Sequence, residues 1–166
     1  MELYFLRHAI AAEPGEIKVS SDAERPLVSE GIKKMKKGAE AMKKMGLEFD
    51  EIVASPYLRA KETAEIVIQE MGLKQKLRFS DALVPNAAFK DFLKFLVSFP
   101  PKSRLLLVGH QPSVGDFISM LISGRSDAAL DIKKGSLTLV EATPNGQEIH
   151  GELKWMLAPK QLREVV

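Results

Sequence analysis

The amino-acid sequence predicts an α/β fold: a three-layer α/β/α sandwich with a mainly parallel sheet and a carboxyl-terminal β-hairpin. Short apolar runs alternate with segments of helical period from residue 3 to residue 122, which is typical of strand-helix units. An Asn-Gly pair at 145–146 then separates two apolar segments, a strong hairpin signal. The 166 residues fit one domain, 1–166, and the 45% that are hydrophobic suffice for a sizeable core.

Strand and helix signals alternate through the first half of the chain. The expected elements are a strand at 3–6, a loop over 9–28, a helix over 30–45, a short strand at 52–54 and a helix that runs to Met71. Ser29 is the expected cap of the first helix. Ser55 is the expected cap of the second, with Pro56 at its first position.

The second half continues this alternation and then changes to antiparallel strands. The expected elements are a weak strand at 76–80, a loop over 81–88, a helix over 89–97, a strand at 105–108, a helix over 114–122, strands at 135–142 and 147–156, and a helical turn after Pro159. The run at 105–108 is the most apolar in the chain, so it is expected at the centre of the sheet.

Composition excludes several classes of function. The net charge is only +2, from 24 basic and 22 acidic residues, which argues against nucleic acid and membrane partners. There is no cysteine, and the three histidines are far apart in sequence, so no dedicated metal site and no cofactor are expected. No stretch has the length of a membrane helix. A cytoplasmic protein is the default expectation, with a monomer as its oligomeric state.

Basic and imidazole side chains follow three of the expected strands. Arg7 and His8 come directly after the first, Arg59 opens the helix after the second, and His110 follows the central one. Because the carboxyl ends of parallel strands meet at one edge of a sheet, these four residues are expected to lie together. The amino end of a helix favours anions, which suits Arg59 to phosphate.

This set of residues indicates phosphoryl chemistry. No carboxylate is expected among them, so the site should attract a dianion such as phosphate. A neutral imidazole is a competent nucleophile toward phosphorus, and surrounding positive charge lowers its pKa. Arginines neutralise the transition state without a metal.

Five stretches of the sequence match the motifs of one known family. They are Leu-Arg-His-Ala at 6–9, Glu-Arg-Pro-Leu at 24–27, Ser-Pro-Tyr-Leu-Arg-Ala-Lys-Glu-Thr-Ala at 55–64, Val-Gly-His-Gln-Pro at 108–112 and Leu-Lys-Trp-Met-Leu-Ala-Pro-Lys at 153–160. With these stretches the sequence resembles the histidine phosphatase superfamily, also called the phosphoglycerate-mutase-like family, and within it the SixA phosphohistidine phosphatases. The first stretch resembles the R-H-G signature, with alanine where glycine is usual. The stretches span nearly the whole chain in the family's order.

The resemblance implies a role for each residue. His8 would be the nucleophile that forms a phosphohistidine intermediate, which water then hydrolyses. Arg7 and Arg59 would bind the phosphoryl group, and His110 would complete the pocket and stabilise the transferring charge. Arg25 matches a basic position of the SixA-like loop and would assist binding.

One departure bears on the substrate. Larger members use a Glu as general acid, and this chain has no Glu between Glu70 and Glu141, which leaves Asp81 as the nearest candidate. A missing acid, worth about 10²–10⁴ in rate, should matter less for the labile P–N bond of phosphohistidine than for an ester. The short loop at 81–88 also predicts an open site, which suits a phosphohistidine on another protein such as a signalling phosphotransfer domain.

Three other interpretations stay open at this point. The nearest is a phosphatase for a small phosphorylated metabolite or nucleotide, with Asp81 or water as the acid. A mutase is a second, although it needs a closed pocket to protect its phosphoenzyme from water. A module that binds phosphohistidine or phosphate without turning it over is a third, and the presence of both His8 and His110 argues against it.

Overall fold

A computed structural model describes residues 1–145 and 148–165, and it contains one six-stranded sheet. The strand order is β3-β2-β4-β1-β5-β6, in which the first four strands are parallel and the last two are antiparallel. The strands are β1 (Glu2–Arg7), β2 (Glu51–Ala54), β3 (Leu77–Phe79), β4 (Arg104–Gly109), β5 (Leu137–Asn145) and β6 (Glu148–Leu157). The predicted mainly parallel sheet with a carboxyl-terminal hairpin is confirmed.

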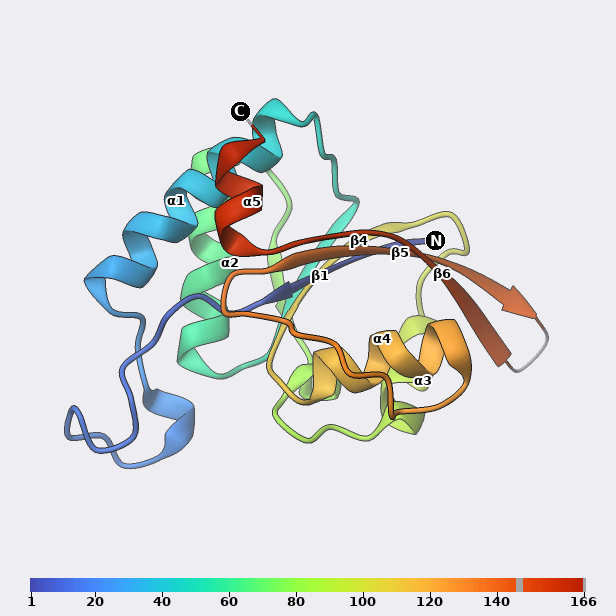
Figure 1. Ribbon diagram of the computed structural model, residues 1–166, viewed down its shortest axis with the longest axis horizontal. Coiled ribbons are helices and arrows are strands. Elements are labelled where there is room, and N and C mark those ends of the chain that lie inside the picture. Colours follow the sequence, from blue (N-terminus) through green and yellow to red (C-terminus); the bar gives the residue numbers. More distant parts are fainter. Residues whose placement is uncertain (146–147, 166) are drawn as a thin grey trace.

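Helices cover both faces of the sheet, as Figure 1 shows. One layer holds α1 (Ser29–Lys44), α2 (Leu58–Met71) and α5 (Pro159–Glu164), and the other holds α3 (Phe89–Leu96) and α4 (Ser113–Ser123). Two short 3-10 helices, η1 (Asp22–Glu24) and η2 (Asp81–Leu83), lie in the loops after β1 and β3. The arrangement is the predicted α/β/α sandwich.

Two hydrophobic cores fill the spaces between the three layers. Because side chains alternate along a strand, β1 contributes to both cores: Tyr4 and Leu6 pack toward α1 and α2, and Leu3 and Phe5 pack toward α3 and α4. Phe92 of α3 stacks on Phe117 of α4 in the second core, with ring centroids 4.3 Å apart. Burial on both faces accounts for the unbroken apolar run of a central strand.

The register between β1 and β4 places the two histidines side by side. Leu6 pairs with Val108 and Arg7 pairs with Gly109, so both strands end at the same level. The backbone N–H of His8 then donates to the carbonyl of Gly109 at 3.0 Å. The sheet therefore brings His8 and His110 to one edge, as the sequence predicts.

Two helix starts differ from the prediction. Ser29 is the first residue of α1 rather than its cap, and Val28 holds the cap position. Ser55 does not cap α2, which begins at Leu58 with Tyr57 as its cap. The Ser55 hydroxyl contacts His110 instead, and Pro56, expected at the first helical position, lies before the helix. The predicted turn around Pro144 lies partly outside the described residues, since 146 and 147 are not among them.

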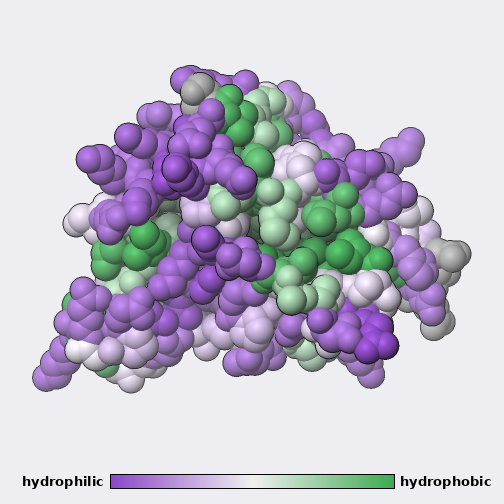
Figure 2. Space-filling view, in the orientation of Figure 1, coloured by the Kyte–Doolittle hydropathy of each residue, from purple (hydrophilic) through white to green (hydrophobic). Residues whose placement is uncertain are grey.

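The surface is mainly polar. Figure 2 shows hydrophilic residues over most of one face, with apolar residues gathered along its middle, where β5 and β6 pass between the helix layers. The edge strand β6 exposes Leu153, but it also carries Glu152 and Lys154, and charges on an edge strand oppose pairing with another chain. Within residues 1–145 and 148–165, no helix has the length and hydropathy needed to span a membrane.

Candidate active site

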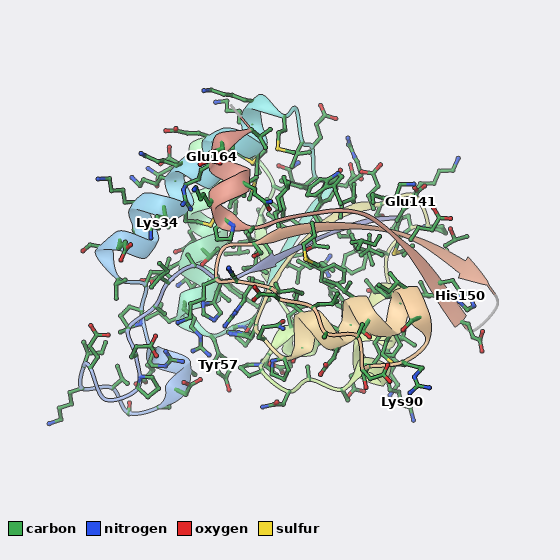
Figure 3. All side chains as sticks on the ribbon, in the orientation of Figure 1. Lys34, Tyr57, Lys90, Glu141, His150 and Glu164 are labelled. Carbon is green, nitrogen blue, oxygen red and sulfur yellow. The ribbon has the colours of Figure 1, made fainter. Side chains whose placement is uncertain are left out.

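His8, Arg59 and His110 meet at the carboxyl edge of the sheet and are nearly inaccessible to solvent. Their exposed fractions are 5%, 3% and 1%, respectively. The two imidazole rings have centroids 5.1 Å apart, and Nε of Arg59 lies 3.3 Å from Nε2 of His8. Tyr57, labelled in Figure 3, packs edge-on against His110 at 5.2 Å. Three residues that the sequence predicts to converge therefore do so.

Backbone contacts fix the tautomer of His8. Its Nδ1 lies 2.7 Å from the carbonyl oxygen of Ala9. Since a carbonyl only accepts, Nδ1 carries the proton and donates it. Nε2 consequently keeps its lone pair, and it accepts the Nε–H of Arg59. An imidazole held in this form presents Nε2 as a nucleophile.

The surroundings of His8 keep it neutral. Burial lowers its pKa to about 2, and the positive charges of Arg59 and Arg7 act in the same direction, against the hydrogen bond to Ala9. The lone pair on Nε2 is therefore available throughout the neutral range. This satisfies the first requirement of nucleophilic catalysis.

Thr63 connects the segment after His8 to the helix that carries Arg59. Its hydroxyl accepts the backbone N–H of Ala9 at 3.0 Å and donates to the carbonyl of Arg59 at 2.6 Å. The side chain is fully buried, four residues after Arg59 on α2. The pair of hydrogen bonds ties the backbone of Ala9, next to His8, to the turn of α2 from which Arg59 projects. The sequence shows Thr63 only as part of a motif and gives no sign of this role.

His110 is held by a serine from the neighbouring strand end. Its Nε2 lies 2.8 Å from Oγ of Ser55, and the same Oγ accepts the backbone N–H of Tyr57 at 3.2 Å. Burial and the charge of Arg59 lower the pKa of His110 to about 3, so this ring is also neutral near pH 7. Its Nδ1 is buried and has no hydrogen-bond partner among the described residues.

Arg7 approaches the site from the end of β1. Nη1 donates to the carbonyl of Ile132 at 2.7 Å, and Nε is buried without a partner among the described residues. Burial lowers the pKa of Arg7, a direction that the neighbouring Arg59 reinforces and Asp131 opposes. A half-buried guanidinium whose inaccessible Nε–H is unused is suited to a bound oxyanion.

The structure adds a carboxylate that the sequence analysis does not include. Asp22 of η1 accepts from Nη2 of Arg59 at 3.0 Å and from Nε of Arg25 at 2.8 Å. Its backbone carbonyl accepts from Nη1 of Arg59 at 2.8 Å. The expectation of a site free of carboxylates is therefore wrong. Partial burial alone would raise the pKa of Asp22, but the hydrogen bonds from Arg25 and Arg59 outweigh it and lower that pKa.

The loop that carries Asp22 also covers the site. Arg25 is linked to the active-site residues by Asp22, whose carboxylate accepts from its Nε. Nη1 of Arg25 donates to the carbonyl of Ala12 at 2.5 Å. The short loop at 81–88 predicts an open site, yet His8 and His110 are buried. The physical reason is that residues 9–28 supply contacts at the site, since both the carbonyl and the side chain of Asp22 bind Arg59.

Asp81 and His150 lie apart from this group. Asp81 is exposed at the start of η2, and no side-chain hydrogen bond joins it to the site in the described part of the chain. His150 is exposed near the far end of the β5–β6 hairpin, far from Tyr57 in Figure 3. Across the described ranges, no three His, Cys, Asp or Glu side chains are grouped so that they could hold a metal ion.

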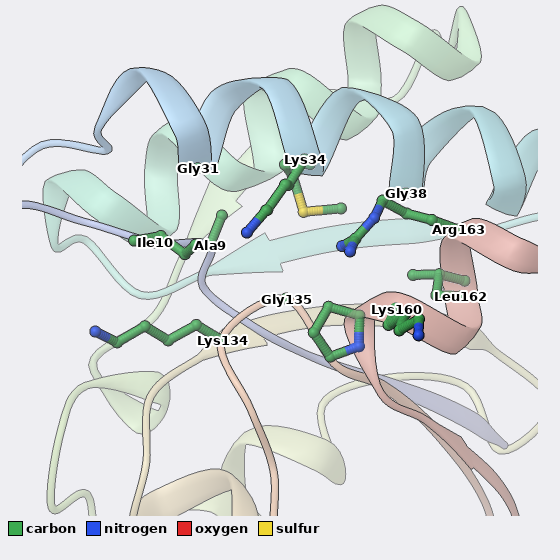
Figure 4. Close-up of a pocket in the computed structure, with 12 residues that line it drawn as sticks. Ala9, Ile10, Gly31, Lys34, Gly38, Lys134, Gly135, Lys160, Leu162 and Arg163 are labelled. Carbon is green, nitrogen blue, oxygen red and sulfur yellow. The ribbon is translucent and has the colours of Figure 1, made fainter.

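A separate pocket of about 120 Å³ lies against the backbone of Ala9 and Gly135 (Figure 4). Met35 and Leu162 form part of its apolar lining, and four cations from α1, α5 and the segment before β5 surround it. Three of them are paired with carboxylates, in the pairs Lys34–Glu30, Lys134–Glu13 and Lys160–Glu164. His8 does not line this pocket, so it is distinct from the candidate active site.

Comparisons with known proteins agree with this geometry. The model of the histidine phosphatase superfamily (branch 1) matches residues 3–83. An uncharacterized protein of Picosynechococcus sp. is 34% identical, over 98% of this chain and 99% of its own. The phosphohistidine phosphatase SixA of Escherichia coli is 25% identical, over 98% of this chain and 97% of its own. The solved structure of the protein histidine phosphatase SixA with tungstate superposes with a TM-score of 0.84, at 24% identity, over 98% of this chain and 99% of that one.

Proposed function

The chain belongs to the histidine phosphatase superfamily and is a phosphatase, and from this premise we propose that it removes phosphate from a histidine of another protein through a covalent intermediate on His8. The observation that carries the proposal is the tautomer of His8. Its Nδ1 is held by the carbonyl of Ala9 at 2.7 Å, which leaves the Nε2 lone pair beside Arg59. That is the state in which an imidazole attacks phosphorus.

In the first step, Nε2 of His8 forms a bond to phosphorus and the bond from phosphorus to the leaving group breaks. Arg7 and Arg59 hold the phosphoryl oxygens, since both have guanidinium donors in or beside the site. His110 supplies a further donor next to His8. These groups balance the charge that spreads over the oxygens in the transition state, which is the main requirement of phosphoryl transfer.

In the second step, water attacks phosphorus, the bond from phosphorus to Nε2 breaks, and inorganic phosphate leaves. His8 returns to its starting form because the hydrogen bond from Nδ1 to Ala9 is kept throughout. The proton of the attacking water passes to solvent or to phosphate. Neither step uses a metal ion, so we expect activity in the presence of a chelator.

Phosphohistidine suits this site because its cleavage needs little general acid catalysis. The second ring nitrogen of a phosphohistidine is protonated by solvent near neutral pH, so the imidazole leaves as a neutral molecule. An alkoxide has to receive its proton from the enzyme. Asp22 is the carboxylate nearest to Arg59, and two arginines hold it ionised, which makes it a poor proton donor. The similarity to the Escherichia coli phosphohistidine phosphatase supports the same substrate class.

A phosphatase for a small phosphorylated metabolite is the second candidate, and one observation favours it. The reacting groups lie beneath the loop that carries Asp22 and Arg25, with His8 only 5% exposed. A small phosphate ester reaches such a site more easily than a side chain on a folded protein. Under this alternative the ester's leaving group takes its proton from water, since Asp81 lies apart from the reacting groups.

The two candidates differ in the substrate they turn over faster. Phosphate release is measured, in EDTA, from a histidine-phosphorylated phosphotransfer protein and from an alkyl phosphate ester, with His8→Ala as the inactive control. Fast release from the protein, at least 10-fold above the ester in kcat/KM, is the expected result, since loss of general acid catalysis is worth about 10²–10⁴ in rate. Equal or faster turnover of the ester would contradict the phosphohistidine proposal.

A further inference from the structure

Ser55 is a fully buried serine whose hydroxyl contacts the second histidine of the site. It lies directly after β2, and its exposed fraction is 0%. Its Oγ is 2.8 Å from Nε2 of His110 and accepts the backbone N–H of Tyr57 at 3.2 Å. The sequence pattern of a serine before a proline predicts a helix cap instead, so this contact is visible only in the fold.

The two possible proton arrangements between Ser55 and His110 are not equivalent. If Nε2 of His110 carried the proton, the hydroxyl proton of Ser55 would lack an acceptor among the described residues, and Nδ1 would be a buried bare lone pair. If the hydroxyl donates to Nε2 instead, the serine oxygen accepts from Tyr57 and donates to His110. The proton of the neutral ring then sits on Nδ1. The first arrangement leaves two buried groups without a partner among the described residues, whereas the second leaves one, the N–H at Nδ1.

We propose that Ser55 is a positioning residue that holds neutral His110 in the tautomer with its proton on Nδ1, so that His110 donates this N–H to the phosphoryl group. The inference rests on the proposed phosphoryl transfer at His8 and deepens it. Nδ1 is the one ring nitrogen of His110 without a partner in the described chain, and the ring lies 5.1 Å from that of His8.

This arrangement resolves how an uncharged histidine helps a dianion to react. A neutral imidazole stabilises an oxyanion only through an N–H, because a bare nitrogen lone pair repels it. The Ser55 hydroxyl donates to Nε2 of His110 and so keeps the proton of the neutral ring on Nδ1. Replacing the hydroxyl by hydrogen frees His110 to place its proton on Nε2 and to turn the Nδ1 lone pair toward the substrate.

The test is the tautomer of His110, read by ¹⁵N–¹H correlation of the imidazole rings in labelled protein near pH 7. Wild-type protein should show the proton on Nδ1, with a resonance that shifts when inorganic phosphate is added. Ser55→Ala should move the proton to Nε2 in a large fraction of molecules. The variant should also lose roughly 10- to 100-fold in kcat, less than the cost of about 10²–10³ for deleting such a donor outright, because some molecules keep the proton on Nδ1.

Ser119→Ala is the matched control. Ser119 is also 0% exposed, and its hydroxyl donates to the carbonyl of Arg125 and accepts the N–H of Ala128 at 3.1 Å, away from His110. This variant loses a comparable pair of buried hydrogen bonds, so it should lose stability while keeping the His110 tautomer and kcat. Ser55→Thr keeps the hydroxyl and should keep the tautomer.

The proposal is wrong if wild-type His110 carries its proton on Nε2, or if Ser55→Ala leaves the proton on Nδ1. It is also wrong if Ser119→Ala lowers kcat as much as Ser55→Ala does. The spectroscopic readout needs no turnover. A protein with the expected tautomers but no phosphatase activity would contradict the proposed function and leave the assignment of Ser55 intact.

Discussion

Asp22 and Arg59 form an ion pair beside His8, the candidate nucleophile. Oδ2 of Asp22 lies 3.0 Å from Nη2 of Arg59, and the carbonyl of Asp22 accepts from Nη1 at 2.8 Å. The third donor of this guanidinium, Nε, faces His8. Nη1 and Nη2 each carry a second N–H, so a phosphoryl group can bind Arg59 beside Asp22, and the negative charge of Asp22 then opposes that binding.

Asp22→Asn should consequently tighten the binding of oxyanions. The amide keeps the shape of the carboxylate but carries no charge. Because the Asp22 side chain is 52% exposed, solvent limits its ion pair with the buried Arg59 to about 0–1 kcal/mol. We expect the Ki of inorganic phosphate as a competitive inhibitor to fall by a few fold. Asp127→Asn breaks an exposed ion pair with Arg125 and should leave Ki unchanged. A Ki that rises in Asp22→Asn would mean that Asp22 orients Arg59 for the substrate rather than opposing its binding.

Arg59→Lys should lower kcat strongly while changing the free energy of unfolding much less. Lysine keeps the charge but loses the planar fork that reaches His8 and a phosphoryl group together. Loss of one such donor costs about 10²–10³ in kcat. Arg125→Lys, at an exposed arginine, is the control and should retain full activity. Steady-state kinetics on an aryl phosphate measures kcat of both variants. A kcat of Arg59→Lys within a factor of 3 of wild type, roughly 0.6 kcal/mol, would show that the guanidinium of Arg59 is not needed for catalysis.

The two buried histidines should make the protein less stable in mild acid. The pKa of His8 is lowered to about 2 and that of His110 to about 3, below the value of 6.5 in an unfolded chain. The unfolded state therefore binds protons that the folded state does not, and stability is full above pH 6.5 and lost as the pH falls toward the folded pKa values.

From pH 7.5 to pH 5, we expect the free energy of unfolding to fall by about 2–4 kcal/mol for the two histidines together, measured by urea denaturation. A variant with His8→Gln and His110→Gln lacks both groups and should show a flatter dependence over this range. A wild-type slope no steeper than that of the double variant would show that the histidines titrate normally in the folded state.

Thr63→Val should destabilise the fold and reduce activity together. Valine has the same shape, but it leaves the backbone N–H of Ala9 without its acceptor and so loosens the carbonyl that fixes His8. A buried unsatisfied group costs about 1–3 kcal/mol. Thr138→Val provides a close control, because Thr138 is equally buried and its hydroxyl has no partner among the described residues. That change should be neutral or stabilising, and equal losses in both variants would contradict the role given to Thr63.

The sequence predicts the parts of the site that depend on strand order. Leu3–Leu6 and Leu105–Val108 are unbroken apolar runs, which indicate buried strands, and a parallel sheet places the ends of such strands at one edge. His8 and His110 are therefore foreseeable as neighbours, and the register of β1 with β4 confirms this.

The contacts of Asp22 and Ser55 are not foreseeable in the same way. Asp22 lies in an irregular loop with no period, so its reach to Arg59 depends on how the whole of 9–28 folds back over the sheet edge. Ser55 precedes a proline, a local pattern that favours a helix cap. The Ser55 hydroxyl forms a hydrogen bond with His110 instead, and this tertiary contact outweighs the local preference.

The most direct test of the central claim is the site of phosphorylation. The enzyme is mixed with a phosphorylated substrate and quenched within milliseconds, and the trapped phosphoryl group is located by mass spectrometry and ³¹P NMR. Because Nδ1 of His8 is engaged by Ala9, we predict a single adduct on Nε2 of His8, absent from His8→Ala, with His150→Ala labelled normally. A phosphoryl group on another residue or on Nδ1, or turnover without any adduct in a variant that lacks His8, would contradict the account.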